Sequence, residues 1–282
     1  MITVHSLERA QGMPVYPGHM EITEESDGLL LLNEVDLEEY LKRVTPSEMP
    51  PTYELEALKA QAVCARTYAW RQIQGNAYST YGAHVDDSTN FQVYNNTLTF
   101  DSTDTAVNET FGQLLEYNGD PIEAFYYSTS DGHGTDGSVW GADASNTPYL
   151  RAVTINNKAK KLDLTSNEAF ESFIKDENTD AYDSDFPMFR WNTKTTSTIL
   201  DEKIGGVGRI TGLTITSEGS GWIREDPEGR WNGRFQDIFR AEQDPQHSRK
   251  CITCIQQERR FHIYGMGYAS QRFHLYREQR NR

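Results

Sequence analysis

Several features that would place a protein in a special class are missing from this chain of 282 residues. It contains no run of about 18 apolar residues, the length of a membrane-spanning helix, so no segment is predicted to cross a membrane. Its net charge is −15, which argues against a nucleic-acid partner because phosphate binding needs clustered lysine and arginine. The sequence also shows no internal repeat.

Cysteines are few, and the three that are present do not make the even set of a disulfide framework. Cys64 falls inside a predicted helix and fits the role of a small apolar packing residue. Cys251 and Cys254 form a lone C-x-x-C motif, which with His247 or His262 offers zinc ligands. A structural zinc site needs four ligands at compatible geometry, and we predict neither a metal nor a cofactor.

The N-terminus lacks the charged and apolar regions of a signal peptide. Two expectations follow, and the sequence leaves both open. Either the protein is cytoplasmic, or an export segment is missing from this chain.

Aromatic residues, by contrast, are plentiful: they make up 11% of the chain, with 15 Tyr and 5 Trp. The length suits one large domain or two modest ones, and the aromatic content is enough for a substantial core. It also leaves aromatic side chains for the surface, as in many carbohydrate-binding proteins.

Hydrophobic periodicity and turn residues predict an α+β fold, rich in strands, with a central alanine-rich helix. This helix is expected to begin after a cap at Thr52 and to run to about Gln74, where Gly75 ends it. A shorter helix with Asp36 as its N-cap precedes it. The predicted strands are 2–6, 19–23, 29–32, 91–94, 114–117, 122–128 and 210–216.

One glutamate stands out in the proline-rich segment 44–51, VTPSEMPP. Prolines fix their own φ at about −65° and bias the preceding residue away from helix, so Glu48 is predicted to lie on a stiff, non-helical elbow. A carboxyl group held there beside Met49 and two prolines is partly shielded from water, which suits an acid/base catalyst. The alternative is an ordinary acidic residue that complements the dipole of the following helix.

The alanine-rich helix has one narrow face, because small residues recur there at helical spacing. Polar side chains near this face are interpreted as supporting a site: Lys59, Gln61, Arg66 and Tyr68. A buried arginine costs several kcal/mol unless it is paired. Arg66 is therefore predicted to have a carboxylate partner or to line a site.

Three segments together are similar to the stage II sporulation protein D family, which also includes amidase-enhancer proteins. They are 37–41 (LEEYL), 44–50 (VTPSEMP) and 55–69 (LEALKAQAVCARTYA). Shorter runs also fit: 92–94 (QVY), 124–130 (AFYYSTS), 139–141 (VWG), 148–150 (PYL) and 189–191 (FRW). The resemblance covers roughly residues 15–220, and the first three segments form a long and specific motif.

This resemblance implies lytic cleavage of peptidoglycan between N-acetylmuramic acid and N-acetylglucosamine, which leaves a 1,6-anhydro end. The family's catalytic acid/base is the glutamate that matches Glu48. Hydrolysis of a glycoside usually needs two carboxylates. A lytic enzyme uses the 6-hydroxyl of the sugar as nucleophile, so one glutamate can serve as acid and then as base, provided that it starts protonated.

Substrate contacts are predicted in the hydroxyl-rich segment that contains Ser128, Thr129 and Ser130, for which an ordinary polar turn is the alternative. Trp140 suits stacking on a sugar face or packing in the core. The family usually ends in a glycine-rich segment with Met-Ser-Gln. Here 264–271 reads YGMGYASQ, with Ala269 in place of the methionine and Gln271 as the matching glutamine, which we include among the substrate contacts.

Two segments of the chain differ from the family pattern. Some members carry a zinc site of Cys and His just before the QVY stretch, but Asp86 and Phe91 stand here where cysteines would be expected, and His84 alone does not make a site. We therefore expect this zinc site to be lost. The sequence after Gln271 does not resemble the family, and the resemblance implies that this end of the chain lies near the glutamate.

We accordingly predict one catalytic domain over residues 1–248 and a basic C-terminal segment over 249–282 that is diverged or partly disordered. The predicted function is that of a lytic transglycosylase acting on peptidoglycan glycan strands, in association with a cell-wall amidase or another wall hydrolase. A non-catalytic glycan-binding or amidase-enhancing module is the first alternative, and a cytoplasmic scaffold the second. The resemblance implies a location outside the cytoplasm, at the cell wall or close to the membrane.

Overall fold

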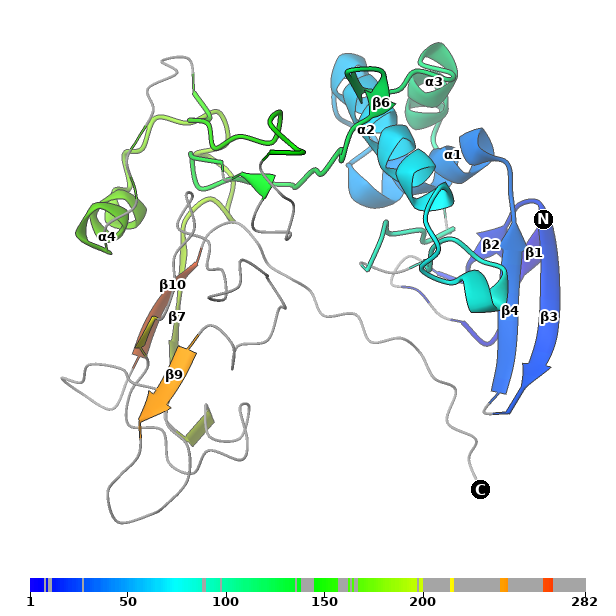
Figure 1. Ribbon diagram of the computed structural model, residues 1–282, viewed down its shortest axis with the longest axis horizontal. Helices are drawn as coiled ribbons and strands as arrows, with labels where there is room; N and C mark the ends of the chain where they lie inside the picture. The colour runs from blue at the N-terminus through cyan, green and yellow to red at the C-terminus, as the bar shows by residue number, and fades with distance from the viewer. Residues whose placement is uncertain are drawn as a thin grey trace. The chain divides into compact units, whose positions relative to one another are not determined.

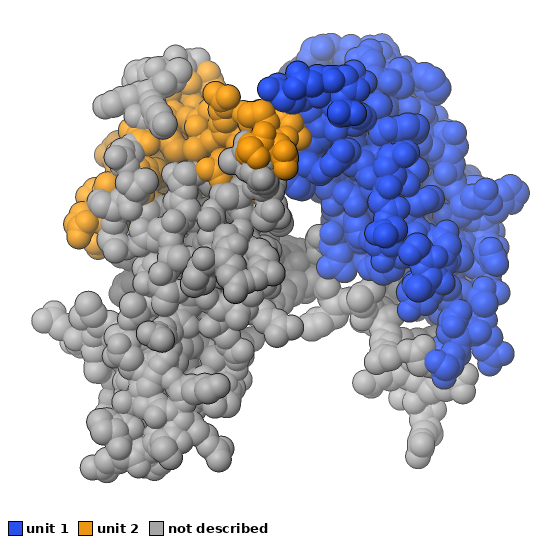
Figure 2. Space-filling view, in the orientation of Figure 1, with its two compact units in different colours: residues 1–126, 270–282 blue, residues 127–269 orange. Residues whose placement is uncertain are grey.

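The computed structural model divides into two compact units: residues 1–126 with 270–282 form unit 1, and residues 127–269 form unit 2 (Figures 1 and 2). We describe each unit by itself. The described residues are 1–7, 9, 12–26, 28–87, 90–96, 98–134, 136–137, 145–156, 162, 164, 167–196 and 198–199, with the strand residues 214–215, 239–242 and 261–265. The α+β class and the predicted limits of the catalytic domain stay predictions.

Unit 1 opens with two antiparallel strand pairs (Figure 1). β1 (Ile2–Thr3) pairs with β2 (Val15–Tyr16), and β3 (His19–Glu25) forms a hairpin with β4 (Gly28–Glu34) in which Ile22 lies opposite Leu31. The strands predicted at 19–23 and 29–32 are confirmed, and the hairpin extends beyond both. Later in the unit, β5 (Glu116–Tyr117) and β6 (Asp120–Pro121) flank a turn at Asn118 and Gly119.

Gly18 allows the chain to pass close to the end of the β3–β4 hairpin. Its φ is +75°, and a Cβ at this position would lie 2.1 Å from the carbonyl oxygen of Glu34. We expect Gly18→Ala to lower the free energy of unfolding by more than about 2 kcal/mol, because a strained φ costs about 1–3 kcal/mol and the contact with rigid backbone adds to it. Gly82→Ala is the matched control, since φ there is +68° and a Cβ meets nothing within 4 Å. Equal losses in urea denaturation of the two variants would contradict this explanation.

Three α-helices follow the strands: α1 (Leu37–Glu48), α2 (Leu55–Ile73) and α3 (Asp101–Glu109), with a short 3-10 helix, η1 (Ser79–Tyr81), between the last two. The Asp36 N-cap of α1 is confirmed, because its side chain accepts the backbone N–H groups of Glu38 at 2.9 Å and Glu39 at 3.4 Å. The cap predicted at Thr52 is wrong. The chain first makes a turn in which the N–H of Tyr53 donates to the Pro50 carbonyl, and α2 begins after Glu54.

The prediction that Glu48 lies on a non-helical elbow is also wrong, because α1 continues through Pro46 and ends with Glu48. Proline removes one backbone hydrogen bond from this last turn. The turn is held instead by complete burial of Val44 and Thr45 and by the N–H of Met49, which donates to the Thr45 carbonyl at 2.9 Å. The helix stops there because Pro50 favours an extended residue before it, and Met49 has φ −135° and ψ 135°.

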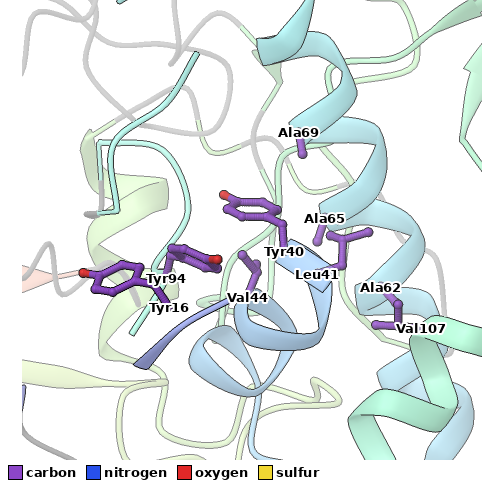
Figure 3. Close-up of a cluster of buried hydrophobic side chains, with 9 residues drawn as sticks. All are labelled: Tyr16, Tyr40, Leu41, Val44, Ala62, Ala65, Ala69, Tyr94 and Val107. Atoms are coloured by element: carbon purple, nitrogen blue, oxygen red, sulfur yellow. The ribbon is translucent and has the colours of Figure 1, made fainter. Parts of the chain in front are cut away.

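The core of unit 1 lies where α1 meets the small-residue face of α2. Figure 3 shows Leu41 and Val44 of α1 on the side of α2 that carries the alanines, with three tyrosine rings beside them. Full burial of a leucine or valine side chain stabilises a fold by about 1.5–3 kcal/mol. The buried cluster consists of Tyr16, Tyr40, Leu41, Val44, Ala62, Ala65, Ala69, Tyr94 and Val107. The narrow face predicted for the alanine-rich helix is therefore confirmed as a helix-packing surface.

Arg66 links the three helices of unit 1 through its guanidinium group. It is 1% exposed, and it donates from Nε and Nη2 to the two carboxylate oxygens of Glu38 at 2.8 and 2.7 Å. It also donates to the carbonyl of Val107 in α3 at 3.2 Å and to the carbonyl of Gln113 at 3.3 Å. The predicted carboxylate partner of Arg66 is therefore confirmed, and it is Glu38 at the start of α1.

Unit 2 contains α4 (Asn167–Lys175), where Phe170 and Ile174 form a small buried cluster with Leu164. Two antiparallel strand pairs accompany it, and their bounds are β7 (Trp191–Thr195) with β10 (Phe261–Gly265) and β8 (Thr214–Ile215) with β9 (Phe239–Glu242) (Figure 1). β8 falls within the strand predicted at 210–216, and β10 falls within the basic segment 249–282.

Candidate active site

Glu48 is held at the C-terminal end of α1 by the segment that follows the 3-10 helix. Its Oε1 accepts the backbone N–H of Val93 at 2.6 Å. The neighbouring Ser47 hydroxyl donates to the Arg43 carbonyl at 2.6 Å and accepts the N–H of Asn95 at 3.2 Å. Two successive side chains of α1 therefore fix residues 93–95 against the helix end, and the Glu48 carboxyl group is held at the same point.

A network of hydrogen-bonded polar side chains, centred on the buried Gln92, lies beside the Glu48 carboxyl group. The Tyr126 hydroxyl lies close enough to sense the charge of that carboxyl, and it accepts a hydrogen bond from Nε2 of Gln92 at 3.0 Å. Gln92 is 1% exposed and also donates to the carbonyl of Ala65 in α2 at 3.2 Å. Its Oε1 accepts the hydroxyl of Tyr40 at 3.2 Å. The network thus joins α1, α2 and two later segments of unit 1 beside one carboxyl group.

Burial controls the protonation of this group. Desolvation raises the pKa of Glu48 above the value of a free glutamate, while the hydrogen bond from Val93 and the nearby Tyr126 hydroxyl act in the opposite direction. Tyr68 of α2 lies close enough to sense the negative charge of Glu48, and its pKa rises to about 12, mainly through burial. Burial thus shifts the Glu48 carboxyl toward its protonated form, which is the direction that a general acid needs.

Comparison with known proteins gives a match to a family model described as stage II sporulation protein, over residues 25–117. This range contains Glu48, Val93 and the helices that position them. These residues, which we call the sporulation-family segment, are similar to the stage II sporulation protein family.

Curated proteins from bacteria are also similar to this chain. The chain is 38% identical over 141 residues to an uncharacterized protein of Brachyspira hyodysenteriae, which covers 49% of this chain and 37% of that protein. It is 39% identical over 134 residues to stage II sporulation protein D of Bacillus subtilis, covering 42% of this chain and 38% of the relative. It is 44% identical over 114 residues to the amidase enhancer of Bacillus subtilis, covering 40% of this chain and 14% of the relative. The chain thus spans less than two fifths of the length of each of these relatives.

Within the sporulation-family segment, the four residues predicted to support the site do not gather around Glu48. Tyr68 lies near its charge, and Gln61 is buried in α2, where its Nε2 has no hydrogen-bond partner among the described residues. Arg66 acts in the ion pair with Glu38. Lys59 lies at the surface, 2.7 Å from the carboxylates of both Glu56 and Glu109. The roles predicted for the four residues stay predictions.

Reasoning from the sequence did not single out three residues that lie near Glu48: Val93, Gln92 and Tyr126. Val93 contributes a backbone N–H, and because every residue except proline has one, the side-chain pattern of the sequence does not indicate this contact. Gln92 and Tyr126 lie in segments that carry the family resemblance, at 92–94 and 124–130. That resemblance was the signal that could have singled them out, although it did not indicate that they share a hydrogen-bond network with Tyr40 of α1.

The predicted sugar-contacting segment lies in unit 2, where the hydroxyl of Ser130 is hydrogen-bonded within the fold. Ser128 is exposed, whereas Thr129 and Ser130 are buried. The Ser130 hydroxyl donates to Asp183 at 3.0 Å and accepts the N–H of Gly132 at 2.9 Å. Substrate contacts by these three residues stay predictions. Trp140, Gln271 and the pair Cys251 and Cys254 lie outside the described residues.

Beyond Ser130, the same loop carries a buried carboxyl group. Burial raises the pKa of Asp131 to about 6, although the N–H of His133 and the charge of Arg190 act in the opposite direction. Arg190 lies between two phenylalanine rings, 4.9 Å from the centre of Phe173 and 4.3 Å from that of Phe189. It donates to the Asp131 carbonyl at 2.6 Å and to Thr179 at 2.9 Å. These contacts attach the loop to the α4 region of unit 2.

Asp86 and Phe91, which stand where zinc-binding cysteines would be expected, make hydrogen bonds and ring contacts. Asp86 accepts the Tyr78 hydroxyl at 2.8 Å and the Asn90 amide at 3.0 Å, and the Phe91 ring lies 5.7 Å from that of Tyr78. The described residues include no group of three or more His, Cys, Asp or Glu side chains that could hold a metal ion. The described helices include none with the length and apolar character needed to cross a membrane.

Proposed function

We propose that the protein is a lytic transglycosylase that cleaves the glycan strands of bacterial peptidoglycan, with Glu48 as its single acid/base group. The observation that carries the proposal is the Glu48 carboxyl group, which is partly buried, has a raised pKa and accepts a backbone N–H at 2.6 Å. The match to the stage II sporulation protein family over residues 25–117 supports it. The proposal places the protein outside the cytoplasm, where this polymer lies.

The reaction needs only one carboxyl group because no water is consumed. The proton of Glu48 passes to the glycosidic oxygen between N-acetylmuramic acid and N-acetylglucosamine as the bond from that oxygen to C1 breaks. The resulting carboxylate then takes the proton of the 6-hydroxyl, whose oxygen forms the new bond to C1. Glu48 is protonated again at the end, and the product carries a 1,6-anhydro ring.

The hydrogen bond from Val93 gives the two oxygens of the carboxyl group different roles. Oε1 acts as an acceptor for the backbone N–H, so the transferable proton of the acid form resides on Oε2. A carboxyl group with its orientation fixed in this way can donate and recover a proton without first losing another contact. This is the behaviour that the two steps of the reaction require.

The second candidate is a glycan-binding module that stimulates a cell-wall amidase without cleaving the strand. The relative that favours it is the protein named amidase enhancer, which is 44% identical over 114 residues. In that case the partner is a wall amidase, and the Glu48 carboxyl group contributes to binding.

Product analysis separates the two functions. We expect the purified protein to release fragments with 1,6-anhydro ends from glycan strands stripped of stem peptides, detected by mass spectrometry as a loss of one water relative to hydrolysed fragments. Fragments with ordinary reducing ends would contradict the lytic chemistry. Retained binding to the strands without any fragments, together with faster release of stem peptides by an added amidase, would establish the second candidate instead.

A further inference from the structure

The chain segment that holds Glu48 is attached to the end of α1 at two points. Val93 donates its backbone N–H to Oε1 of Glu48 at 2.6 Å, and Asn95 donates its N–H to the hydroxyl oxygen of Ser47 at 3.2 Å. The N–H of Tyr94, between them, donates instead to the Asp87 carbonyl at 3.3 Å. Two alternate N–H groups of one segment thus meet two successive side chains of α1, which fixes a single register between them.

The direction of both hydrogen bonds of the Ser47 hydroxyl follows from its partners. The Arg43 carbonyl, 2.6 Å away, can only accept, so the hydroxyl hydrogen must point to it. A backbone N–H can only donate, so the hydroxyl oxygen accepts from Asn95. Arg43 lies one turn earlier in α1, and the next two residues, Val44 and Thr45, are completely buried. The acceptor for Asn95 is therefore tied to a well-packed turn of the helix.

A second set of contacts anchors the same segment on its far side. The carbonyl of Asn96 accepts the N–H of Val15 in β2 at 2.7 Å, and the Asn96 side chain donates to the Tyr94 carbonyl at 3.2 Å. Asn96 is 2% exposed, and its φ of 56° turns the chain there. The bond from Asn95 to Ser47 links this anchored part of the chain to the end of α1, two residues from Val93.

We propose that Ser47 is a positioning residue for the candidate acid, and that its hydroxyl sets the register in which the N–H of Val93 meets Oε1 of Glu48. The consequence for catalysis rests on the proposed function. Without the hydroxyl, the segment keeps its anchor at Asn96 but loses its link to the helix end. The carboxyl group then loses part of the hydrogen bond that favours its ionised form and that leaves the transferable proton on Oε2.

Three tyrosine hydroxyls face the Glu48 carboxyl group closely enough to sense its charge: Tyr40 of α1, Tyr68 of α2 and Tyr126. Burial raises the pKa of all three, to about 12 for Tyr68, so they stay neutral over the range in which a carboxyl group titrates. The Ser47 hydroxyl carries no charge either. A change in the titration of Glu48 on removal of this hydroxyl therefore reports a change in the contacts of the carboxyl group.

The test is the titration of Glu48 in the free protein, followed by NMR with glutamate labelled at the side-chain carboxyl carbon and assigned with Glu48→Gln. We expect Ser47→Ala to raise the pKa of Glu48 by about 0.5–1 unit, because two or three backbone N–H bonds together lower the pKa of a carboxylate by about two units. Ser47→Thr keeps a hydroxyl that can bond the carbonyl one turn earlier, and it should retain the parent pKa.

Amide hydrogen exchange in the same samples checks the cause of the shift. Exchange at Asn95 should become faster in Ser47→Ala, because its acceptor is removed. Exchange at Val93 should become faster as well, by about 2–10-fold, the range that corresponds to the net contribution of one hydrogen bond. Ser47→Thr should leave both rates close to those of the parent protein.

Ser102→Ala is the matched control. Ser102 is half-buried like Ser47, and its hydroxyl also donates to a backbone carbonyl, that of Pro51, at 2.7 Å. This variant should leave the titration of Glu48 unchanged. An unchanged pKa of Glu48 in Ser47→Ala, or equal shifts in Ser47→Ala and Ser102→Ala, would overturn the proposal. If Ser47→Ala fails to fold, Ser47→Cys replaces it in the same comparison, because a thiol is only a weak hydrogen-bond partner.

This measurement is independent of cleavage, so its outcome is distinguishable from failure of the proposed function. If the protein cleaves glycan, the pH above which its rate falls should move upward in Ser47→Ala by the same amount as the pKa of Glu48, and Ser47→Thr should restore it. If the titration shifts as expected and no cleavage occurs in any variant, the positioning role of Ser47 stands and the lytic function is wrong.

Discussion

Glu48→Gln is expected to lower the rate of release of anhydro ends by at least about 100-fold, the lower end of what general acid/base groups contribute. Glutamine has nearly the same shape, and its side-chain oxygen can still accept the N–H of Val93. It has no acidic proton to give to the glycosidic oxygen. Glu54→Gln is the matched control, because Glu54 is an exposed residue that precedes α2 and makes no side-chain capping bond. Full activity of Glu48→Gln would contradict the assigned role.

The same variant should be at least as stable as the parent protein at neutral pH. Burial raises the pKa of Glu48 in the folded state, so the folded protein binds this proton more tightly than the unfolded chain does. The parent therefore loses stability as the pH rises from the unfolded value of 4.5 through the raised folded value, and the variant does not. Urea denaturation at about pH 4 and pH 7 checks this, with the difference between the two proteins expected only at the higher pH.

The largest expected effect on stability is that of breaking the ion pair between Arg66 and Glu38. Arg66→Met leaves the Glu38 carboxylate largely buried, with a side chain that is 13% exposed, and without its cation. Removal of one partner from a buried pair lowers the free energy of unfolding by about 3–5 kcal/mol. The measurement is urea denaturation followed by circular dichroism. A loss below about 1 kcal/mol, as is typical of surface ion pairs, would contradict the structural role.

The double variant Glu38→Leu with Arg66→Met separates two causes of lost stability. One is the loss of the attraction between the two charges, and the other is the cost of a buried carboxylate without a partner. It removes both charged groups, so no carboxylate is left without a partner, and much of the lost stability should return. The recovery should be incomplete, because the carbonyl groups of Val107 and Gln113 also lose their donor. Lys59→Met is the control. Lys59 lies on α2, like Arg66, and its replacement removes two surface ion pairs, so it should change the free energy of unfolding by less than about 1 kcal/mol.

The helices of unit 1 could be predicted because their signals are local. Asp36 before an apolar periodic segment and small residues at helical spacing in α2 depend only on neighbours in the chain. The error at Pro46 has a physical reason: the rule for proline considers one lost hydrogen bond and one steric contact. It does not include the complete burial of Val44 and Thr45, which holds the last turn of α1 against the core.

The site could be predicted only in part, for a related reason. The sequence identified Glu48 as the candidate acid, and apolar neighbours suggested the raised pKa that burial produces. It could not select Glu38 among the many carboxylates as the partner of Arg66, nor bring Gln92 and Tyr126 to the end of α1. These contacts join distant parts of the chain, and they depend on how α1 and α2 pack.

The contact between Glu48 and Val93 has a consequence for how this site tolerates mutation. What holds the acid is a peptide N–H, which every amino acid except proline provides, so the side chain at position 93 can vary during evolution without loss of the contact. The acid itself has no such freedom, since a shorter side chain would not reach that N–H. The residue at position 93 is therefore free to change during evolution, whereas Glu48 is not.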